Sequence, residues 1–457
     1  MNSLKAGFAR GNITPMNGIP MEGYFAPRFS EGVLDELELN VLALEAGEDR
    51  VLLVSIDNCE IYQDVLTEYR RRISEATGVP EDAVFIASTH THTGPCLISD
   101  EAAANYTMFG QPLTAGQQAL IREYRIFTGR RAVDAAAAAL RDLKPARMGI
   151  GTGHAPEVAF VRLFRMKDGS ARTNPGVGNP EILHPIGAVD DRVHVLRFSR
   201  EDAPDLVLVN FANHPDTIGG SMISADWPGF LRRSFEKMTD GTRCIFFNGA
   251  QGDVNHINVN DRTDLYRRLT AGEPTGFARY IGDVVAAGAL QAYHRVEYRD
   301  VDRIRCRQLV VDAPSNMPDP GEMPAARRIV ALHEAGRDDE IPEQGMGITT
   351  LVSEALRMVR LEHGPETFPL LLSAVTVGDV ALLGIPGEPF TSIGLGLKET
   401  EGWAMVLPCG LVNAYWDYFP SMEAYEAGGY ESRSSSYKAG VAELIVKEGK
   451  ALLAQLK

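Results

Sequence analysis

The chain has 457 residues and carries 45 lysines and arginines against 61 aspartates and glutamates, which gives a formal net charge of −16. This acidic balance argues against a nucleic acid or an anionic membrane as partner, because both attract a basic face. The N-terminal residues lack the apolar core of a secretory signal, and no run approaches the roughly 18 apolar residues of a membrane span. A cytoplasmic location is therefore expected. The five cysteines form no CxxC pair, so neither a disulfide framework nor a thiolate zinc site is predicted.

Strand and helix patterns alternate along the chain. Paired strand-like runs joined by turn residues predict hairpins over residues 40–57, 160–172, 193–213 and 370–386. Apolar residues at helical spacing predict helices over residues 61–76, 117–142, 226–238, 275–293, 346–362 and 437–456. Together these patterns predict an α/β fold with mixed sheets, hairpins and flanking helices.

One stretch, residues 313–345, is rich in proline and acidic residues around a single short helical pattern. It reads either as a linker between domains or as an excursion that covers a cleft. The motifs with chemical potential fall on both sides of it, so we favour the excursion.

Four apolar runs end in the same way, by breaking into glycine, proline and polar residues. They lead into residues 89–95, 214–217, 248–256 and 386–391. Open α/β sheets bind ligands at the carboxyl ends of their strands. One such ending is common, but four predict a shared site.

The first of these endings contains His90 and His92. A lone His-x-His pair is more often structural than functional. His214 and Glu388, which follow two of the other strands, shift the balance toward a metal. Three imidazole or carboxylate ligands with an open fourth position are the arrangement of catalytic zinc.

Other residues stay ambiguous on the pattern alone. Asp253 fits the cap of a helix as well as a catalytic role, and Asn255 beside it can be read either way. Arg162 stands between core-like residues, where an arginine is usually paired with a carboxylate but could also hold a substrate oxygen. Residues 415–430 contain four tyrosines, which either cover the core or line a cleft as ligands or proton donors.

Five ordered motifs carry a family resemblance: STHTHTGP, NFANHP…ISADWPG, NGAQGDVN, IPGEPFT and NAYWDYFPSMEAYEAGGYE. In this order they resemble the catalytic domain of the neutral/alkaline non-lysosomal ceramidases, from about residue 6 to residue 431. The resemblance implies one large catalytic domain over residues 1–457, with 313–345 as an insertion. It also implies a zinc-dependent amide hydrolase, whose Zn²⁺ would be held by His90, His214, Glu388 and Tyr418.

The same resemblance assigns further roles. A zinc-activated water would attack an amide or ester carbonyl. His92 would polarise the carbonyl or stabilise the developing oxyanion, and Tyr430 matches the family's second active-site tyrosine. Arg162 matches a substrate-contacting arginine, and Asp253 is a possible general base of lower rank.

This sequence departs from the family in ways that concern the substrate. Asn255 stands where ceramidases carry a serine, and neither a signal peptide nor a C-terminal β-sandwich domain is recognisable. We therefore expect a cytoplasmic hydrolase acting on a small or polar substrate and not on long-chain ceramide.

Two other functions remain open at this stage. The chain could be a metal-dependent lyase or hydrolase of a carbohydrate-like or cyclic metabolite, or a non-catalytic binding protein with a degenerate site. The complete ligand set speaks against the binding protein. The metal-dependent amidohydrolase barrel would need eight regular βα repeats, and the metallo-β-lactamase pattern would need an Asp-His after the His-x-His. The oligomeric state is not readable from the sequence.

Overall fold

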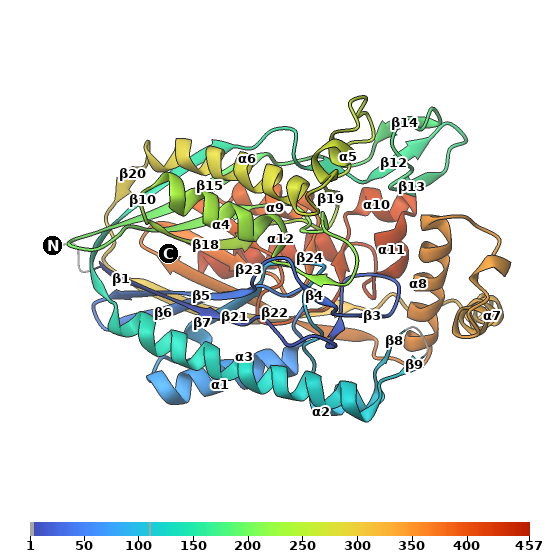
Figure 1. Cartoon of the computed structure of the whole chain (residues 1–457), viewed down its shortest axis with the longest axis horizontal. Helices are drawn as coiled ribbons and strands as arrows, with labels where there is room; N and C mark the ends of the chain where they lie inside the picture. Colours follow the sequence, from blue (N-terminus) through green and yellow to red (C-terminus); the bar gives the residue numbers. More distant parts are fainter. Residues whose placement is uncertain (1–3, 109–110) are drawn as a thin grey trace.

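The computed structural model describes residues 4–108 and 111–457, which form two β-sheets packed face to face between layers of helices (Figure 1). This agrees with the predicted α/β class. The larger sheet has, in spatial order, β18 (Arg243–Asn248), β16 (Leu206–Phe211), β15 (Arg192–Arg200), β10 (Lys144–His154), β1 (Leu4–Asn12), β5 (Glu38–Ala46), β6 (Asp49–Ile56) and β7 (Val84–Ser88), with β20 (Glu297–Arg299) paired to β10. The smaller sheet has β21 (Ile304–Pro314), β22 (Thr367–Val377), β23 (Val380–Gly384) and β25 (Met405–Cys409).

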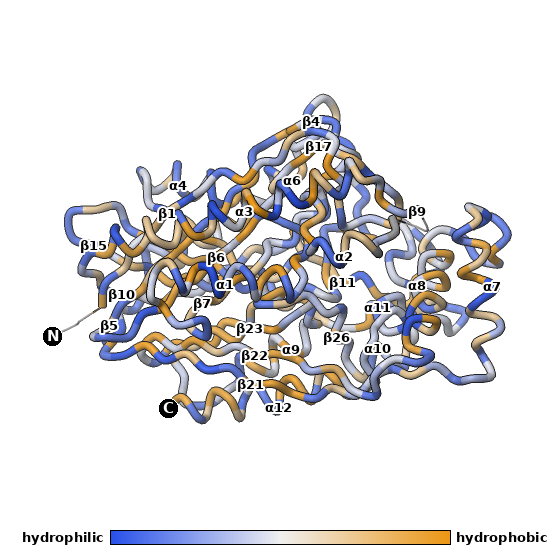
Figure 2. The backbone as a smooth tube through the Cα atoms, turned by 90° about the horizontal axis from the view of Figure 1, so that it is seen from below, coloured by the Kyte–Doolittle hydropathy of each residue, from blue (hydrophilic) through white to orange (hydrophobic). Residues whose placement is uncertain are grey.

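Successive side chains of a strand point to opposite faces of the sheet, so each strand contributes both to the core between the two sheets and to the core beneath the outer helices. On β5, Leu42 and Leu44 pack between the two sheets, whereas Val41 and Ala43 point to the other face, under helices. This period of two is what a strand buried on both faces requires. In Figure 2 the apolar segments accordingly run through the central strands of both sheets.

Helices cover the two outer faces. The larger sheet is covered by α1 (Gln63–Thr77), α3 (Ala115–Arg141), α4 (Asp226–Met238) and α6 (Gly276–Tyr293). The smaller sheet is covered by α9 (Thr391–Lys398) and α12 (Val441–Ala454). All six predicted helices are confirmed within a few residues, as are the four predicted hairpins. No helix in residues 4–108 and 111–457 combines the length and the hydrophobicity needed to cross a lipid bilayer.

Short elements complete the fold at the end of the molecule where the site lies. The short strands are β2 (Pro20–Met21), β3 (Arg28–Phe29), β4 (Gly32–Val33), β8 (Thr107–Met108), β9 (Gln111–Pro112), β11 (Phe160–Val161), β12 (Leu163–Met166), β13 (Ala171–Thr173), β14 (Ile182–Pro185), β17 (Met222–Ile223), β19 (Val254–Asn255), β24 (Glu388–Pro389) and β26 (Tyr418–Phe419). The remaining helices are α2 (Asp100–Asn105), α5 (Leu265–Thr270), α7 (Met323–Glu334), α8 (Met346–Leu361), α10 (Met422–Ala427) and α11 (Tyr430–Ser434), with single 3₁₀ turns at Glu81–Ala83 and Asp338–Glu340.

The stretch 313–345 lies within the connection between the paired strands β21 and β22. Its helix α7 packs through an apolar cluster against α8, and α8 contributes side chains to the wall of the main cavity. The division of the chain into one domain with this stretch as an insertion stays a prediction.

Candidate metal centre

The ends of strands from both sheets converge on one point. The larger sheet curls so that its edge strand β18 contacts β6 and β7, and the Ser55 hydroxyl on β6 donates to the Phe246 carbonyl on β18 at 2.6 Å. The chain after β25 of the smaller sheet then joins β7, because Asn413 N–H donates to the Ile86 carbonyl at 2.8 Å. The strand endings predicted to share a site therefore lie together.

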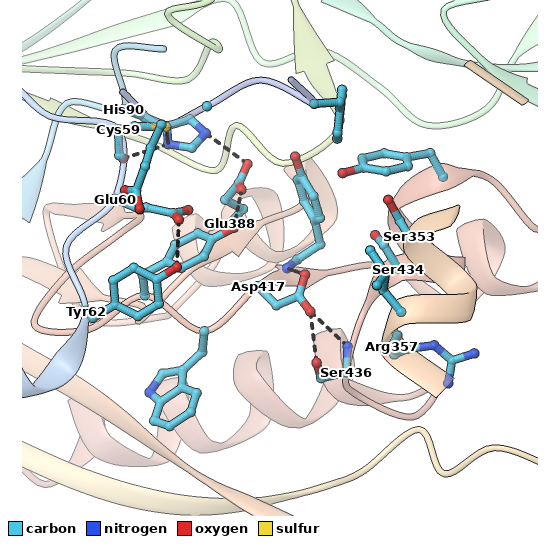
Figure 3. A pocket seen from close by; sticks show the side chains of 18 of the residues that line it. Cys59, Glu60, Tyr62, His90, Ser353, Arg357, Glu388, Asp417, Ser434 and Ser436 are labelled. Atoms are coloured by element: carbon cyan, nitrogen blue, oxygen red, sulfur yellow. Dashed lines mark hydrogen bonds and ion pairs between the residues drawn. The ribbon is translucent and has the colours of Figure 1, made fainter. Parts of the chain in front are cut away.

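His90, His214 and Glu388 meet at this point, each nearly fully buried. Glu388 Oε2 lies 3.2 Å from His90 Nε2 and 3.0 Å from His214 Nε2. Figure 3 shows the His90 ring and the Glu388 carboxylate directed at each other.

The outer ring nitrogens of both histidines face backbone carbonyls. His90 Nδ1 lies 2.9 Å from the Cys59 carbonyl, and His214 Nδ1 lies 2.8 Å from the Gln251 carbonyl. A carbonyl only accepts, so Nδ1 carries a hydrogen in both rings, and the Nε2 of a neutral ring presents its lone pair to the cluster. Burial, followed by the nearby Arg162, lowers the pKa of His214 to about 4, so its ring is neutral at pH 7.

The ring nitrogens and the carboxylate that face one another are suited to binding a metal ion. Glu388 Oε2 is buried and accepts no hydrogen bond of good geometry. Three electron-pair donors directed at one another repel unless a cation lies between them. Histidines that donate Nδ1–H to a carbonyl and turn Nε2 inward are the usual arrangement around protein-bound zinc. The cluster can therefore hold a metal.

His92 stands beside the cluster with the same orientation. Its Nδ1 lies 2.6 Å from the Gly23 carbonyl, and its Nε2 lies 3.2 Å from His90 Nε2. Cys59, His90 and His92 form a second group close enough to share a metal.

The backbone at His90 is in the left-handed region, with a φ of 73°. This conformation costs a non-glycine residue about 1–2 kcal/mol and is held here by the hydrogen bond from His90 N–H to the Asn58 carbonyl at 2.8 Å. The turn reverses the chain directly after β7, so that His90 and His92 face the same point.

Tyrosines from the segment after β25 reach the cluster. Tyr418 is brought beside Glu388 by the parallel pairing of β24 with β26, and the Tyr415 hydroxyl donates to Glu388 Oε1 at 3.3 Å. Tyr430 opens α11 and packs edge to face on Tyr418, with ring centroids 5.9 Å apart.

Arg162 is buried next to these groups and is paired. Its Nε lies 2.7 Å from Glu431 Oε1, and its terminal nitrogen donates to the Gly252 carbonyl at 2.5 Å. Its guanidinium lies over the Tyr418 ring, 5.2 Å from the centroid. Burial opposes the charge, but Glu431 raises the pKa of Arg162, so the cation is retained.

Asp253 and Asn255 lie near the cluster but outside the lining of the cavity. Asp253 accepts hydrogen bonds from Thr391 N–H at 2.7 Å and from the Thr391 hydroxyl at 2.8 Å, at the start of α9. Asn255 donates to Asn174, which does line the cavity. Burial raises the pKa of Asp253 to about 6, against the opposing effect of Thr391.

A cavity of about 1350 Å³ opens from the metal cluster. Its walls come from the turn after β2, the ends of β6 and β7, the start of α1, helix α8 and the tyrosine segment. His90, His92, Glu388, Tyr418, Tyr430 and Arg162 all line it. The cavity is large enough for a metabolite of ordinary size beside the cluster.

Sequence reasoning missed Glu22 and Glu60 on one wall of this cavity, whereas Tyr415 on the same wall belongs to the tyrosine segment for which a cleft lining is one of the two predictions. The sequence does contain a signal for Glu60, because β6 is followed directly by Asp-Asn-Cys-Glu and is thus a fifth strand that leads into polar residues. Nothing in the sequence singles out Glu22, because it reaches the cavity through a turn between two-residue strands.

Comparison with known proteins finds similarity in sequence and in fold. No protein-family model matches the chain. Neutral ceramidase A of Dictyostelium discoideum is 21% identical over 86% of the chain, and the chain spans 64% of the length of that relative.

Two solved structures match all of the chain and 75% of their own length, both at 18% identity. They are the neutral ceramidase of Pseudomonas aeruginosa, with a TM-score of 0.73, and a ceramidase complexed with C2, with a TM-score of 0.70. The chain has their mixed α/β fold. It is therefore similar to neutral ceramidases in fold over its whole length and in sequence over 86% of it.

Proposed function

We propose that this protein is a zinc-dependent hydrolase that cleaves an amide, or an ester, in a small polar substrate. The observation that carries the proposal is the cluster of His90, His214 and Glu388 at the wall of the large cavity, whose three ligand atoms lie within 4.8 Å of one another. The relationship to neutral ceramidases supports amide hydrolysis as the reaction.

In this proposal His90, His214, Glu388 and Tyr418 hold the metal. A Zn²⁺ ion bound there supplies Lewis-acid activation of water and of the substrate carbonyl. The backbone carbonyls behind the two histidines fix the ring orientation, so the site loses little entropy on binding.

The remaining residues handle substrate and protons. His92 accepts a proton from the attacking water at Nε2 while its Nδ1–H stays on the Gly23 carbonyl. It can then pass that proton to the carbonyl oxygen or to the leaving group of the substrate. Tyr430 offers a phenol for the same purpose. Arg162, fixed by Glu431 and the Gly252 carbonyl, binds a substrate oxygen. Asp253 takes a lesser part, because Thr391 already occupies one of its oxygens.

Two features of the cavity support a polar substrate over long-chain ceramide. Carboxylates and phenol groups, and not an apolar surface alone, line the wall beside the cluster. Asn255, which stands at the position of the family serine, donates to Asn174 and is not itself among the residues that line the cavity.

Metal analysis of purified protein tests the proposal. We expect one zinc per chain, and its loss together with activity in His90→Ala and His214→Ala. His184→Ala, at an exposed histidine outside the cavity, is the matched control and should keep both. Protein without stoichiometric metal, or a fully active His90→Ala variant, would contradict the proposal.

Reaction in ¹⁸O-labelled water identifies the chemistry. A screen of small N-acyl amines and esters should give products that carry one solvent oxygen on the released acid. An unsaturated product without solvent oxygen would identify a lyase instead. Turnover of long-chain ceramide as fast as the best small substrate would contradict the assignment of a polar substrate.

A further inference from the structure

One wall of the cavity carries two glutamates close to the metal cluster. Glu60 follows β6, and its Oε1 accepts a hydrogen bond from the Tyr62 hydroxyl at 3.1 Å. In Figure 3 the Glu60 carboxylate lies on the same side of the cavity as His90 and Glu388, whereas Arg357 of α8 lies on the opposite side. Glu60 therefore faces the space that a substrate bound at the cluster would occupy.

Glu22 backs this wall from the turn after β2 and is 5% exposed. The Cys96 thiol donates to its Oε1 at 3.1 Å, and its Oε2 is buried without a hydrogen-bond partner of good geometry. In the described part of the chain neither Glu22 nor Glu60 forms an ion pair with a lysine, arginine or histidine. His90 acts on Glu60 from the neighbouring cluster, but neither glutamate has a cationic partner of its own, which buried carboxylates normally have.

The two carboxylates also act on each other. Burial, and then Glu60, raises the pKa of Glu22 well above its usual range, and burial raises the pKa of Glu60 to about 7. Arg162, which lines the same cavity, is already engaged by Glu431. One added positive charge would satisfy both glutamates, whereas a neutral hydroxyl group would leave their repulsion in place.

Aromatic rings surround the same space. The rings of Tyr62 and Tyr415 stand edge to face with centroids 6.2 Å apart, and both line the cavity next to Glu60. Tyrosine faces attract ammonium groups, and carboxylates beside them strengthen the attraction. This combination suits a protonated amine better than an alkyl chain or a carboxylate.

We propose that Glu22, Glu60, Tyr62 and Tyr415 form a subsite for a protonated amino group of the substrate. This inference rests on the proposed function and specifies its substrate class: an N-acylated amine that carries a second, free amino group near the bond to be cleaved. Glu60 contacts the ammonium directly, and Glu22 lies behind it, so that a bound cation favours the ionised form of both carboxyls.

Binding of n-butylammonium and of n-butanol to the zinc-loaded protein at pH 8 tests the subsite without any turnover. Calorimetry should show binding of the amine and at least tenfold weaker binding of the alcohol. Glu60→Gln should weaken amine binding about tenfold or more, as expected for loss of a charge-assisted hydrogen bond. Glu22→Gln should weaken it about three- to tenfold.

The control is Glu75→Gln, which removes the same charge from the exposed outer side of α1, where Glu75 pairs with Arg71. It should leave amine binding unchanged. An amine that coordinated the zinc would bind equally well to Glu60→Gln, so that result would overturn the subsite. Equal affinity for amine and alcohol would overturn it as well.

Hydrolysis separates this inference from the proposed function. The pair to compare is N-acetyl-1,4-diaminobutane and N-acetyl-4-aminobutan-1-ol, which differ only in the terminal group. We expect faster cleavage of the diamine, with the advantage lost in Glu60→Gln through a raised KM. If neither is cleaved although n-butylammonium binds, the proposed function fails and the subsite stands. If both are cleaved equally and n-butylammonium does not bind, the subsite fails and the function stands.

Discussion

Glu388 and Tyr418, far apart in the sequence, lie directly opposite each other in the parallel pairing of β24 with β26. This two-residue ladder fixes the distance between the carboxylate at the metal cluster and the phenol assigned as fourth ligand. Tyr418→Phe should therefore lower zinc affinity at least about tenfold while leaving the ladder intact. Tyr415→Phe, which removes the hydrogen bond to Glu388 Oε1, should lower it less. Competition with a chromogenic chelator measures both affinities.

Tyr425→Phe is the control for this pair of variants. Tyr425 belongs to the same segment, but its hydroxyl donates to the Tyr437 carbonyl and it does not line the cavity. This variant should lose some stability and keep its zinc affinity. A Tyr418→Phe protein that binds zinc as tightly as the unmodified protein would remove Tyr418 from the ligand set.

Substitutions in the buried pair of Arg162 and Glu431 should affect stability and activity separately. Glu431→Gln leaves the guanidinium buried without its partner, which should cost about 3–5 kcal/mol of unfolding free energy. The double variant Arg162→Met/Glu431→Leu removes both charges and should recover most of that loss. It should not recover activity, because Arg162 is assigned to bind the substrate.

Urea denaturation and initial rates distinguish these outcomes. Glu354→Gln, which breaks the partly exposed pair of Glu354 with Arg433, should cost less than about 1 kcal/mol and serves as the reference. A double variant with restored activity would show that Arg162 only supports the fold.

Much of this architecture could be predicted because it depends on local patterns. Strands such as β7 and β23 are short apolar runs with a sharp polar ending, and helices such as α4 and α6 keep their apolar spacing over several turns. Both signals are contained within a few residues. Because open α/β sheets bind ligands at the carboxyl ends of their strands, the sequence alone predicts that His90 and Glu388 share a site.

The acidic wall could not be predicted in the same way. Glu60 follows a strand that the sequence assigns to a hairpin, and Glu22 depends on how a turn folds over the cavity. The position of Tyr415 beside Glu388 depends on positive φ values at Asn413 and Asp417, which only tertiary contacts select. Such positions depend on packing between segments that are distant in the sequence, so no periodic pattern in the sequence predicts them.

Close backbone contact between α6 and β10 predicts a strong effect of added methyl groups. A Cβ on Gly153 would lie 2.0 Å from the Gly288 carbonyl oxygen, and one on Gly288 would lie 2.5 Å from the His154 carbonyl oxygen. Gly153→Ala and Gly288→Ala should each cost about 1–3 kcal/mol or more, because backbone atoms must move. Thermal unfolding measures the loss.

Gly116→Ala provides the contrast, because a Cβ there meets nothing within 4 Å in the first turn of α3. It should leave stability unchanged or raise it by up to about 1 kcal/mol through better helix propensity. Equal stability of Gly153→Ala and Gly116→Ala would contradict the tight contact between helix and sheet.

Buried His194 predicts a loss of stability on acidification. His194 is 6% exposed, its Nδ1 lies 3.0 Å from the Thr152 hydroxyl, and its Nε2 has no hydrogen-bond partner of good geometry. Burial, and then Lys398, lowers its pKa to about 3 against the opposing effect of Asp190; Arg192 and His154 lower it further.

The folded pKa of His194 lies below the unfolded value of about 6.5, so the unfolded chain binds more protons between these two values. The stability that neutral His194 contributes is complete above about pH 6.5 and is lost as the pH falls toward 3. Between pH 7.5 and 5 this group alone should cost about 2 kcal/mol of unfolding free energy. His194→Gln should flatten the urea-derived stability curve by that amount, whereas Thr152→Val, which keeps the imidazole, should lower the curve without changing its slope. An unchanged slope in His194→Gln would exclude His194 as the source of the acid sensitivity.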